Sequence, residues 1–103
     1  MYNLRYLPIT DEDIQNAVEY IGGKLGNPVT ADQLLEELDK TMETFRDFPY
    51  GFEPHHSERP LHDELRWAPV KGYVLYFTVI GDTVEIRRFL HRRRDRKNPD
   101  SVE

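Results

Sequence analysis

One apolar run limits what this chain can fold into more than any other stretch of its sequence. From Tyr73 to Ile80 the residues read YVLYFTVI, and every side chain except that of Thr78 is aromatic or aliphatic. A strand with one face in water would alternate apolar and polar side chains, whereas an unbroken apolar run is typical of a strand buried on both faces. The sequence therefore predicts that residues 73–80 form a central strand of a sheet.

Three further segments have the pattern of strands. Gly81 and Asp82 are suited to a two-residue hairpin turn with glycine at its first central position, and this turn leads into a strand over residues 83–90. Leu65–Val70 can form a short strand before the central one, and residues 2–7 alternate large apolar with polar side chains as a half-buried strand does. We therefore expect one strand at the N-terminus and three in the second half of the chain.

Two amphipathic helices are expected between the first strand and the second. Thr10 can cap the first helix and Thr30 the second, with Gln33 in the capping-box position of the second. Gly22 and Gly23 weaken the end of the first helix. Apolar residues recur at spacings of three and four, so each helix has one apolar face. The first face comprises Ile14, Ala17, Val18, Ile21 and Leu25, and the second comprises Ala31, Leu34, Leu35, Leu38, Met42 and Phe45.

The order of elements is β-α-α-β-β-β, which defines the α+β class. The two helices are joined by a short turn and should form an antiparallel helical hairpin. Neither helix can bury its apolar face alone, so both should pack on one face of a small, mainly antiparallel sheet. With 103 residues, the chain has the length of one small domain. We place this domain at residues 1–97 and a polar tail at residues 98–103.

The composition excludes several kinds of site. The chain has no cysteine, so it can form neither disulfides nor thiolate zinc sites. His55, His56 and His62 lie in or near a proline-rich loop without the spacing of a metal site, and we interpret them as surface residues. No apolar run approaches the roughly 20 residues that cross a bilayer, and the N-terminus lacks the layout of a secretory signal. We expect a cytoplasmic protein without metal, cofactor or membrane partner.

Charge is distributed unevenly along the chain. Residues 1–65 carry 5 basic and 14 acidic side chains, a net charge of −9, whereas residues 66–103 carry 9 basic and 5 acidic side chains, a net charge of +4. The densest basic segment reads RRFLHRRRDRK and contains Arg87, Arg88, Arg92, Arg93, Arg94, Arg96 and Lys97. Either this C-terminal part binds an anionic partner or its charges form a solvated surface.

Three residues in or near the strands have structural as well as functional interpretations. Arg88 alternates with apolar residues of the last strand, where a cation is costly unless a carboxylate pairs with it, so we expect a structural ion pair. His91 shares its strand parity with Phe89 and Glu85, and it is either a poised acid or base or an aromatic filler. Trp67 is expected to pack in the core rather than to anchor a partner.

Five pieces of the sequence are informative as an ordered set. They are YIGGKLGNPVTADQLLEEL, FRDFP, the arginine at position 66, KGYVLYFTV and VEIRRFLHRRRD. In this order and with these gaps, the set resembles the RelE/ParE superfamily of bacterial type II toxins, and the likeness covers residues 1–95. The resemblance implies a compact toxin whose helical hairpin packs on a small, mainly antiparallel sheet. It also implies a cognate antitoxin that neutralises the toxin, and contact with operator DNA only through that antitoxin.

The resemblance leaves the mechanism open, because one branch of the superfamily cuts messenger RNA on the ribosome and another inhibits DNA gyrase without cleaving RNA. A nuclease needs acid–base groups and cations around one phosphate. By resemblance, Arg66 and Arg93 match phosphate-holding arginines, and His91 can supply an acid or base. Similar ribonucleases carry a tyrosine shortly after the terminal basic motif, whereas the residues after Asp95 here are RKN.

We therefore favour a toxin that inhibits growth by binding DNA gyrase. The net charge of −5 favours the same branch, since a protein that enters a phosphate-lined ribosomal site gains from being basic. On this interpretation the partner-binding residues are Arg87, Arg92, Arg93, Arg94, Arg96 and Lys97. Two alternatives stay open: a ribosome-dependent mRNA endoribonuclease that uses Arg66, His91 and Arg93, and a degenerate antitoxin-binding module without activity.

Overall fold

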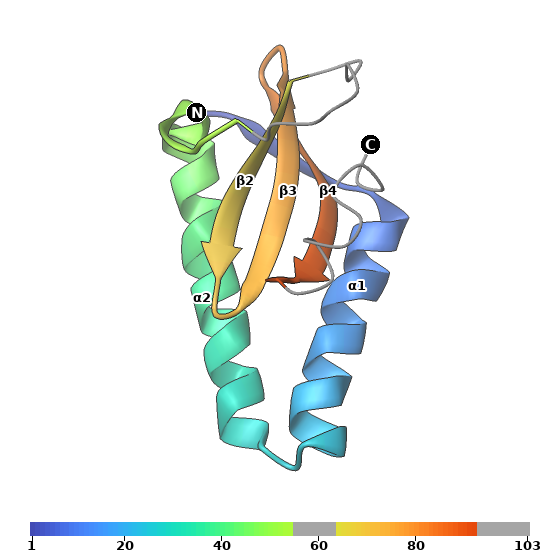
Figure 1. Ribbon diagram of the computed structural model, residues 1–103. Coiled ribbons are helices and arrows are strands. Elements are labelled where there is room, and N and C mark those ends of the chain that lie inside the picture. Colours follow the sequence, from blue (N-terminus) through green and yellow to red (C-terminus); the bar gives the residue numbers. More distant parts are fainter. Residues whose placement is uncertain (55–63, 93–103) are drawn as a thin grey trace.

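The computed structural model describes residues 1–54 and 64–92, and it has the expected order of elements (Figure 1). The strands are β1 (Asn3–Tyr6), β2 (Leu65–Val70), β3 (Tyr73–Ile80) and β4 (Thr83–His91), and the helices are α1 (Pro8–Glu19) and α2 (Pro28–Asp47). A π-helical turn, η1 (Tyr20–Lys24), extends α1, and a 3₁₀ turn, η2 (Pro49–Gly51), follows α2. Within the described residues, no helix has the length and hydropathy of a membrane span.

The four strands form one mixed sheet in the order β1-β4-β3-β2. Strands β2, β3 and β4 are antiparallel neighbours, while β1 lies parallel to β4 at the edge, with Leu4 opposite Val84. The predicted central strand β3 has a neighbour on each side and is buried from Tyr73 to Thr78. The predicted α+β class with a mainly antiparallel sheet is confirmed.

Both helices lie on one face of the sheet, α1 against β4 and α2 against β2 and β1 (Figure 1). The core between helices and sheet contains Ala17, Ile21, Ala31, Leu34, Leu38, Met42 and Phe45 from the helical hairpin and Leu75, Phe77, Val84, Ile86 and Phe89 from the sheet. The predicted apolar faces are therefore confirmed, except that Leu25 and Leu35 are exposed. A smaller cluster of Leu65, Val74, Tyr76 and Leu90 contains no helix residue, and Trp67 packs against it as expected.

The helix starts differ from the prediction, because each helix begins at a proline. Proline suits the first helical position, where its fixed φ is already helical and its missing N–H would have had no partner. The cap of α2 is Asn27, whose side-chain oxygen accepts from the Thr30 amide at 3.1 Å. The prediction that Thr10 and Thr30 are caps is wrong. Thr10 is instead buried in α1, and its hydroxyl donates to the Ile86 carbonyl oxygen of β4 at 2.9 Å.

Strand β4 contains a bulge. Its pairing with β3 shifts by one residue between Tyr76 and Phe77, which makes Arg87 the extra residue of β4. An extra residue reverses the alternation of side chains for the rest of a strand. Phe89 therefore joins the core under the helices, whereas Glu85 lies on the other face of the sheet. The prediction that Glu85 and Phe89 share one face is wrong for this reason.

Candidate functional site

The described residues include only the first part of the basic segment. Arg87, Arg88, His91 and Arg92 are described, whereas Arg93, Arg94, Arg96 and Lys97 lie outside the described residues. The described members of the segment differ in their contacts, and these contacts decide what each side chain can do.

Arg88 is a structural residue. Its Nε donates to Asp13 Oδ2 at 2.7 Å and its Nη2 to Asp13 Oδ1 at 3.1 Å, and the Phe89 amide also donates to Asp13 Oδ2 at 3.0 Å. The two side chains are only 22% and 11% exposed. The hydrogen bond to Asp13 raises the pKa of Arg88 above its usual range, against the opposing effect of burial. The predicted structural ion pair is confirmed, and its partner is Asp13 of α1.

Arg87 contributes to a second ion-pair group, on the face of the sheet away from the helices. Its Nε lies 3.1 Å from Oε1 of Glu85, and the same carboxylate accepts a hydrogen bond from Arg5 of β1. A largely buried carboxylate needs such partners, because desolvation without compensation is costly. The Arg87 charge therefore serves the sheet itself by compensating Glu85.

Arg66, near the start of β2, is held by contacts from three sides. Its Nη1 donates to the Phe52 carbonyl oxygen at 2.6 Å, its Nη2 forms an ion pair with Glu64, and its guanidinium lies 4.9 Å from the centre of the Tyr50 ring. Its side chain is only 15% exposed. Arg66 thus uses both of its terminal nitrogens and one face of its guanidinium in contacts within the protein.

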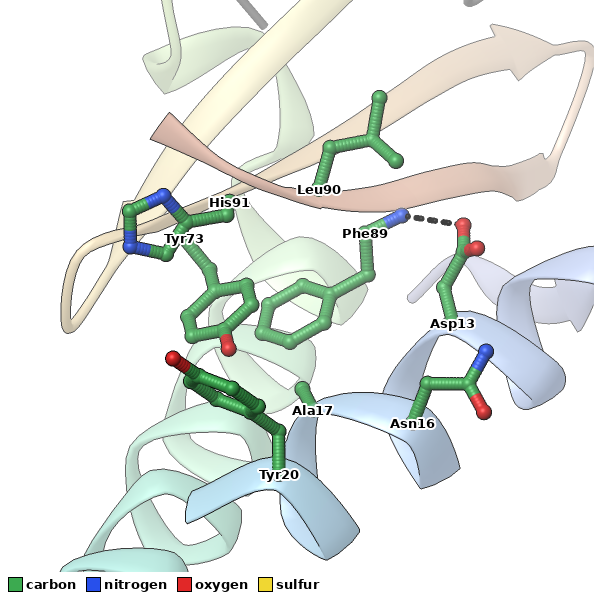
Figure 2. A pocket seen from close by; sticks show the side chains of 8 residues that line it. All are labelled: Asp13, Asn16, Ala17, Tyr20, Tyr73, Phe89, Leu90 and His91. Atoms are coloured by element: carbon green, nitrogen blue, oxygen red, sulfur yellow. Dashed lines mark hydrogen bonds between the residues drawn. The ribbon is translucent and has the colours of Figure 1, made fainter. Parts of the chain in front are cut away.

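His91 lies at the other end of the sheet, beside an open cavity of about 400 Å³ (Figure 2). His91, Tyr73 and Phe89 line it from the sheet, while Asn16 and Ala17 of α1 and Tyr20 of η1 line it from the helical hairpin. The Tyr73 ring stacks on Phe89, with 4.9 Å between centroids and 11° between planes, and His91 packs edge-on against Tyr73 at 5.2 Å. Burial raises the pKa of the Tyr73 phenol, and nearby Tyr20 adds to this effect.

Arg66 and His91 are not brought together. Arg66 pairs with Phe77 of β3 and His91 with Tyr73 of β3. The offset of four positions from Tyr73 to Phe77 corresponds to about 13 Å along the strand, and the two strand spacings between β2 and β4 add about 10 Å across the sheet. The two side chains therefore lie at opposite ends of the sheet. Arg93, the third member of the predicted nuclease set, lies outside the described residues.

The residues that lie opposite His91 across the cavity were not predicted from the sequence. Asn16 of α1 and Tyr20 of η1 lie outside the apolar face of the first helix, and only that face has a recognisable pattern. Asp13 resembles an ordinary acidic residue of a first helical turn. The one local signal is the glycine pair that follows Tyr20, because glycine disfavours a regular α-helix. In the structure, Gly22 and Gly23 belong to the π-helical turn η1.

The arrangement of a helical hairpin over a four-stranded sheet also occurs in a known structure. A solved structure described as "Chromosomal ParDE TA system from P. aeruginosa" has this fold, with a TM-score of 0.67 and 17% sequence identity over 88% of this chain and 96% of that chain. The family model described as "ParE toxin of type II toxin-antitoxin system, parDE" matches residues 4–96. The chain therefore belongs to the ParE toxin family of type II toxin–antitoxin systems, within the RelE/ParE superfamily that its sequence resembles. No curated protein matches the sequence.

Proposed function

We propose that this ParE-family protein is a cytoplasmic toxin that stops bacterial growth by binding DNA gyrase, and that a cognate antitoxin neutralises it. The family match over residues 4–96 supports the toxin role. The choice of gyrase over messenger RNA depends on the chemistry that the described residues can perform.

The environment of Arg66 is the observation that carries this choice. A cation that stabilises a reacting phosphate needs donors aimed at the place where charge develops. Arg66 instead donates to the Phe52 carbonyl oxygen and to Glu64, and it lies at the opposite end of the sheet from His91. This arrangement supports a toxin that acts by binding rather than by cleavage.

The end of β4 is the proposed contact surface. Arg92 is exposed, and its backbone amide donates to the Gly72 carbonyl oxygen at 3.0 Å, which fixes it beside the β2–β3 turn. The sequence continues with Arg93, Arg94, Arg96 and Lys97. We propose that these residues contact the acidic or DNA-bearing surface of the target. Arg87 belongs to the same proposed set, with a smaller contribution because it also compensates Glu85.

The antitoxin is proposed to cover the same cations. The similar solved structure comes from a ParDE system, and we infer a cognate ParD-type antitoxin for this chain. Its C-terminal segment would lie over sheet and helices through apolar anchors and neutralise the basic segment with carboxylates. Operator DNA would then be contacted only through the antitoxin.

The decisive experiment assays the purified full chain against both targets. We expect inhibition of gyrase supercoiling, no mRNA cleavage on translating ribosomes, and relief of inhibition by the antitoxin. Charge reversal of the exposed Arg92, as Arg92→Glu, should weaken gyrase inhibition. Lys40→Glu is the matched control, since Lys40 is an exposed α2 cation with only a 3.5 Å contact to Glu37.

The other outcomes select among the alternatives. A-site cleavage by the wild-type protein, abolished by Arg93→Ala, would replace the gyrase proposal with a ribosome-dependent nuclease. Tight antitoxin binding with neither cleavage nor gyrase inhibition would instead identify a degenerate antitoxin-binding module.

A further inference from the structure

The cavity beside His91 has the size and wall chemistry of a site for a small planar ligand. It lies between the end of α1 with η1 and the end of the sheet where β3 starts and β4 finishes (Figure 2). Its volume of about 400 Å³ falls in the range of ligand pockets, which are mostly apolar with a few polar groups that orient the ligand. No step proposed above for gyrase or antitoxin binding uses this cavity.

Aromatic rings form much of the wall. Tyr73 and Phe89 stack on each other from the sheet, and Tyr20 faces them from η1. Figure 2 shows the hydroxyl ends of Tyr20 and Tyr73 pointing toward one another across the cavity. Rings on two sides of a cavity favour a flat, aromatic ligand, because such a ligand can stack on one ring and meet another edge-on.

The polar groups of the wall carry little net charge. Among the described residues that line the cavity, Asp13 is the only carboxylate, and its two oxygens already bind Arg88 and the Phe89 amide. The remaining polar groups are the Asn16 amide, the Tyr20 and Tyr73 hydroxyls and the His91 imidazole. Each of these groups can both donate and accept a hydrogen bond in its neutral form. A charged group inside the cavity would lose water without gaining a counter-ion from this wall, and an aliphatic ligand would offer no hydrogen bond to the Asn16 amide or to the two tyrosine hydroxyls.

We propose that this cavity binds a nucleobase. A nucleobase is planar, aromatic and neutral, and its edge carries both donors and acceptors, which is the combination that the wall selects. The exposed Arg92 follows His91 directly in the chain and supplies a cation for the phosphate attached to the base. The base can belong to a free nucleotide or to a single strand of nucleic acid, and the chemistry at the cavity is the same in both cases. This proposal does not depend on gyrase being the target.

The test is ligand titration of the ¹⁵N-labelled full chain followed by NMR. The ligands are the four nucleoside monophosphates, a ten-nucleotide single-stranded DNA, an abasic strand of equal length, and inorganic phosphate. We expect shifts of the Asn16, Tyr20, Tyr73 and His91 amides with a mononucleotide or with the base-bearing strand. Shifts with only the base-bearing strand assign the base to single-stranded nucleic acid, and shifts with mononucleotides assign it to a free nucleotide as well.

Two variants with matched controls separate the cavity from the cationic surface. Tyr20→Ala removes a ring that is 46% exposed and should weaken binding about tenfold, the scale of one lost stacking contact. Asn16→Ala should weaken binding severalfold, while Gln15→Ala, its exposed neighbour outside the cavity, should leave binding unchanged. Tyr50→Ala, which removes a tyrosine that is 58% exposed at the other end of the sheet, should also have no effect. Equal binding of inorganic phosphate or the abasic strand, unchanged affinity in Tyr20→Ala, or no shift with any base-bearing ligand would each overturn the proposal.

Discussion

Asp13 on α1 binds Arg88 beside the bulge of β4, with 2.7 Å between Asp13 Oδ2 and Arg88 Nε, and the same oxygen accepts from the Phe89 amide. One carboxylate therefore satisfies a side chain and a backbone group of a strand that lies 75 residues further along the chain. It connects the first helix to the part of β4 in which the basic segment begins.

Replacing Asp13 by asparagine should cost about 2–3 kcal/mol of unfolding free energy, because it leaves the largely buried Arg88 cation without its counter-ion. The loss should be measurable as a lower urea midpoint with an unchanged slope. Glu37→Gln, which breaks the exposed contact to Lys40, is the control and should change stability by less than about 0.5 kcal/mol. Equal effects of the two variants would show that the Asp13–Arg88 pair contributes no more than a surface pair.

Replacing Thr10 by valine should cost about 1 kcal/mol, the usual net contribution of one hydrogen bond. Valine keeps the volume of the buried side chain but loses the hydroxyl that donates to Ile86. The cost stays modest because the Ile86 carbonyl oxygen also accepts from the Leu7 amide at 3.1 Å. Thr10→Ser retains the hydroxyl, so urea unfolding of the two variants separates the hydrogen bond from the methyl group. A neutral Thr10→Val would contradict the role given to the hydroxyl.

Two glycine-to-alanine changes should act in opposite directions. Gly81 has φ +61° in the β3–β4 turn, where an alanine side chain costs roughly 1–2 kcal/mol. Gly23 in η1 has no atom within 4 Å of an added Cβ, so alanine there should stabilise the protein by roughly 0.5–1 kcal/mol through the unfolded chain. Thermal unfolding of both variants beside the wild type tests the pair. Destabilisation by Gly23→Ala would indicate that the π-helical turn requires glycine for another reason.

Tyr73 should make the folded state sensitive to alkaline pH. Burial raises the pKa of its phenol above the usual value of 10.0, so the folded protein holds this proton more tightly than the unfolded chain. Its contribution to stability is therefore complete below about pH 10 and is lost as the pH rises through the folded-state pKa. Unfolding free energies measured between pH 8 and pH 11 should fall less steeply in Tyr73→Phe, which keeps the stacked ring. Identical slopes in wild type and variant would refute this assignment.

Charge reversal of Arg92 and Arg94 together should weaken the complex with the antitoxin and flatten its dependence on salt, because fewer charge pairs form across the interface. Calorimetric titration at low and high salt measures both effects. Lys40→Glu on α2 is the control for charge reversal at an exposed site outside the proposed interface. Unchanged affinity at low salt would remove these arginines from the proposed interface.

The sequence predicts the elements well, because the signals that define them are local. The unbroken apolar run of residues 73–80 and the apolar faces that include Leu34 and Leu38 each require burial of a particular kind. The parallel position of β1 beside β4 has no such signal, since an alternating pattern states which face of a strand is buried but not which strand lies next to it.

The candidate site is less predictable because it depends on one irregularity and on contacts between distant segments. The bulge at Arg87 reverses which face of the sheet each later residue of β4 occupies. The sequence carries no signal for it, because Arg87 and Arg88 are the same residue type. The Asp13–Arg88 pair and the cavity between Tyr20 and Tyr73 arise only when α1 packs on β4. Only the ion pair of Arg88 could be anticipated, from the cost of a buried cation.

The pairing of β1 with β4 also has a consequence for how the protein is made. Asn3 of β1 is opposite Thr83 of β4, so the ribosome makes β1 well before the strand with which it pairs. The sheet cannot close until β4 has left the ribosome, and a translation product that stops before Thr83 lacks β4 altogether. The fold is thus complete only after β4 has been synthesised, however early β1, α1 and α2 emerge.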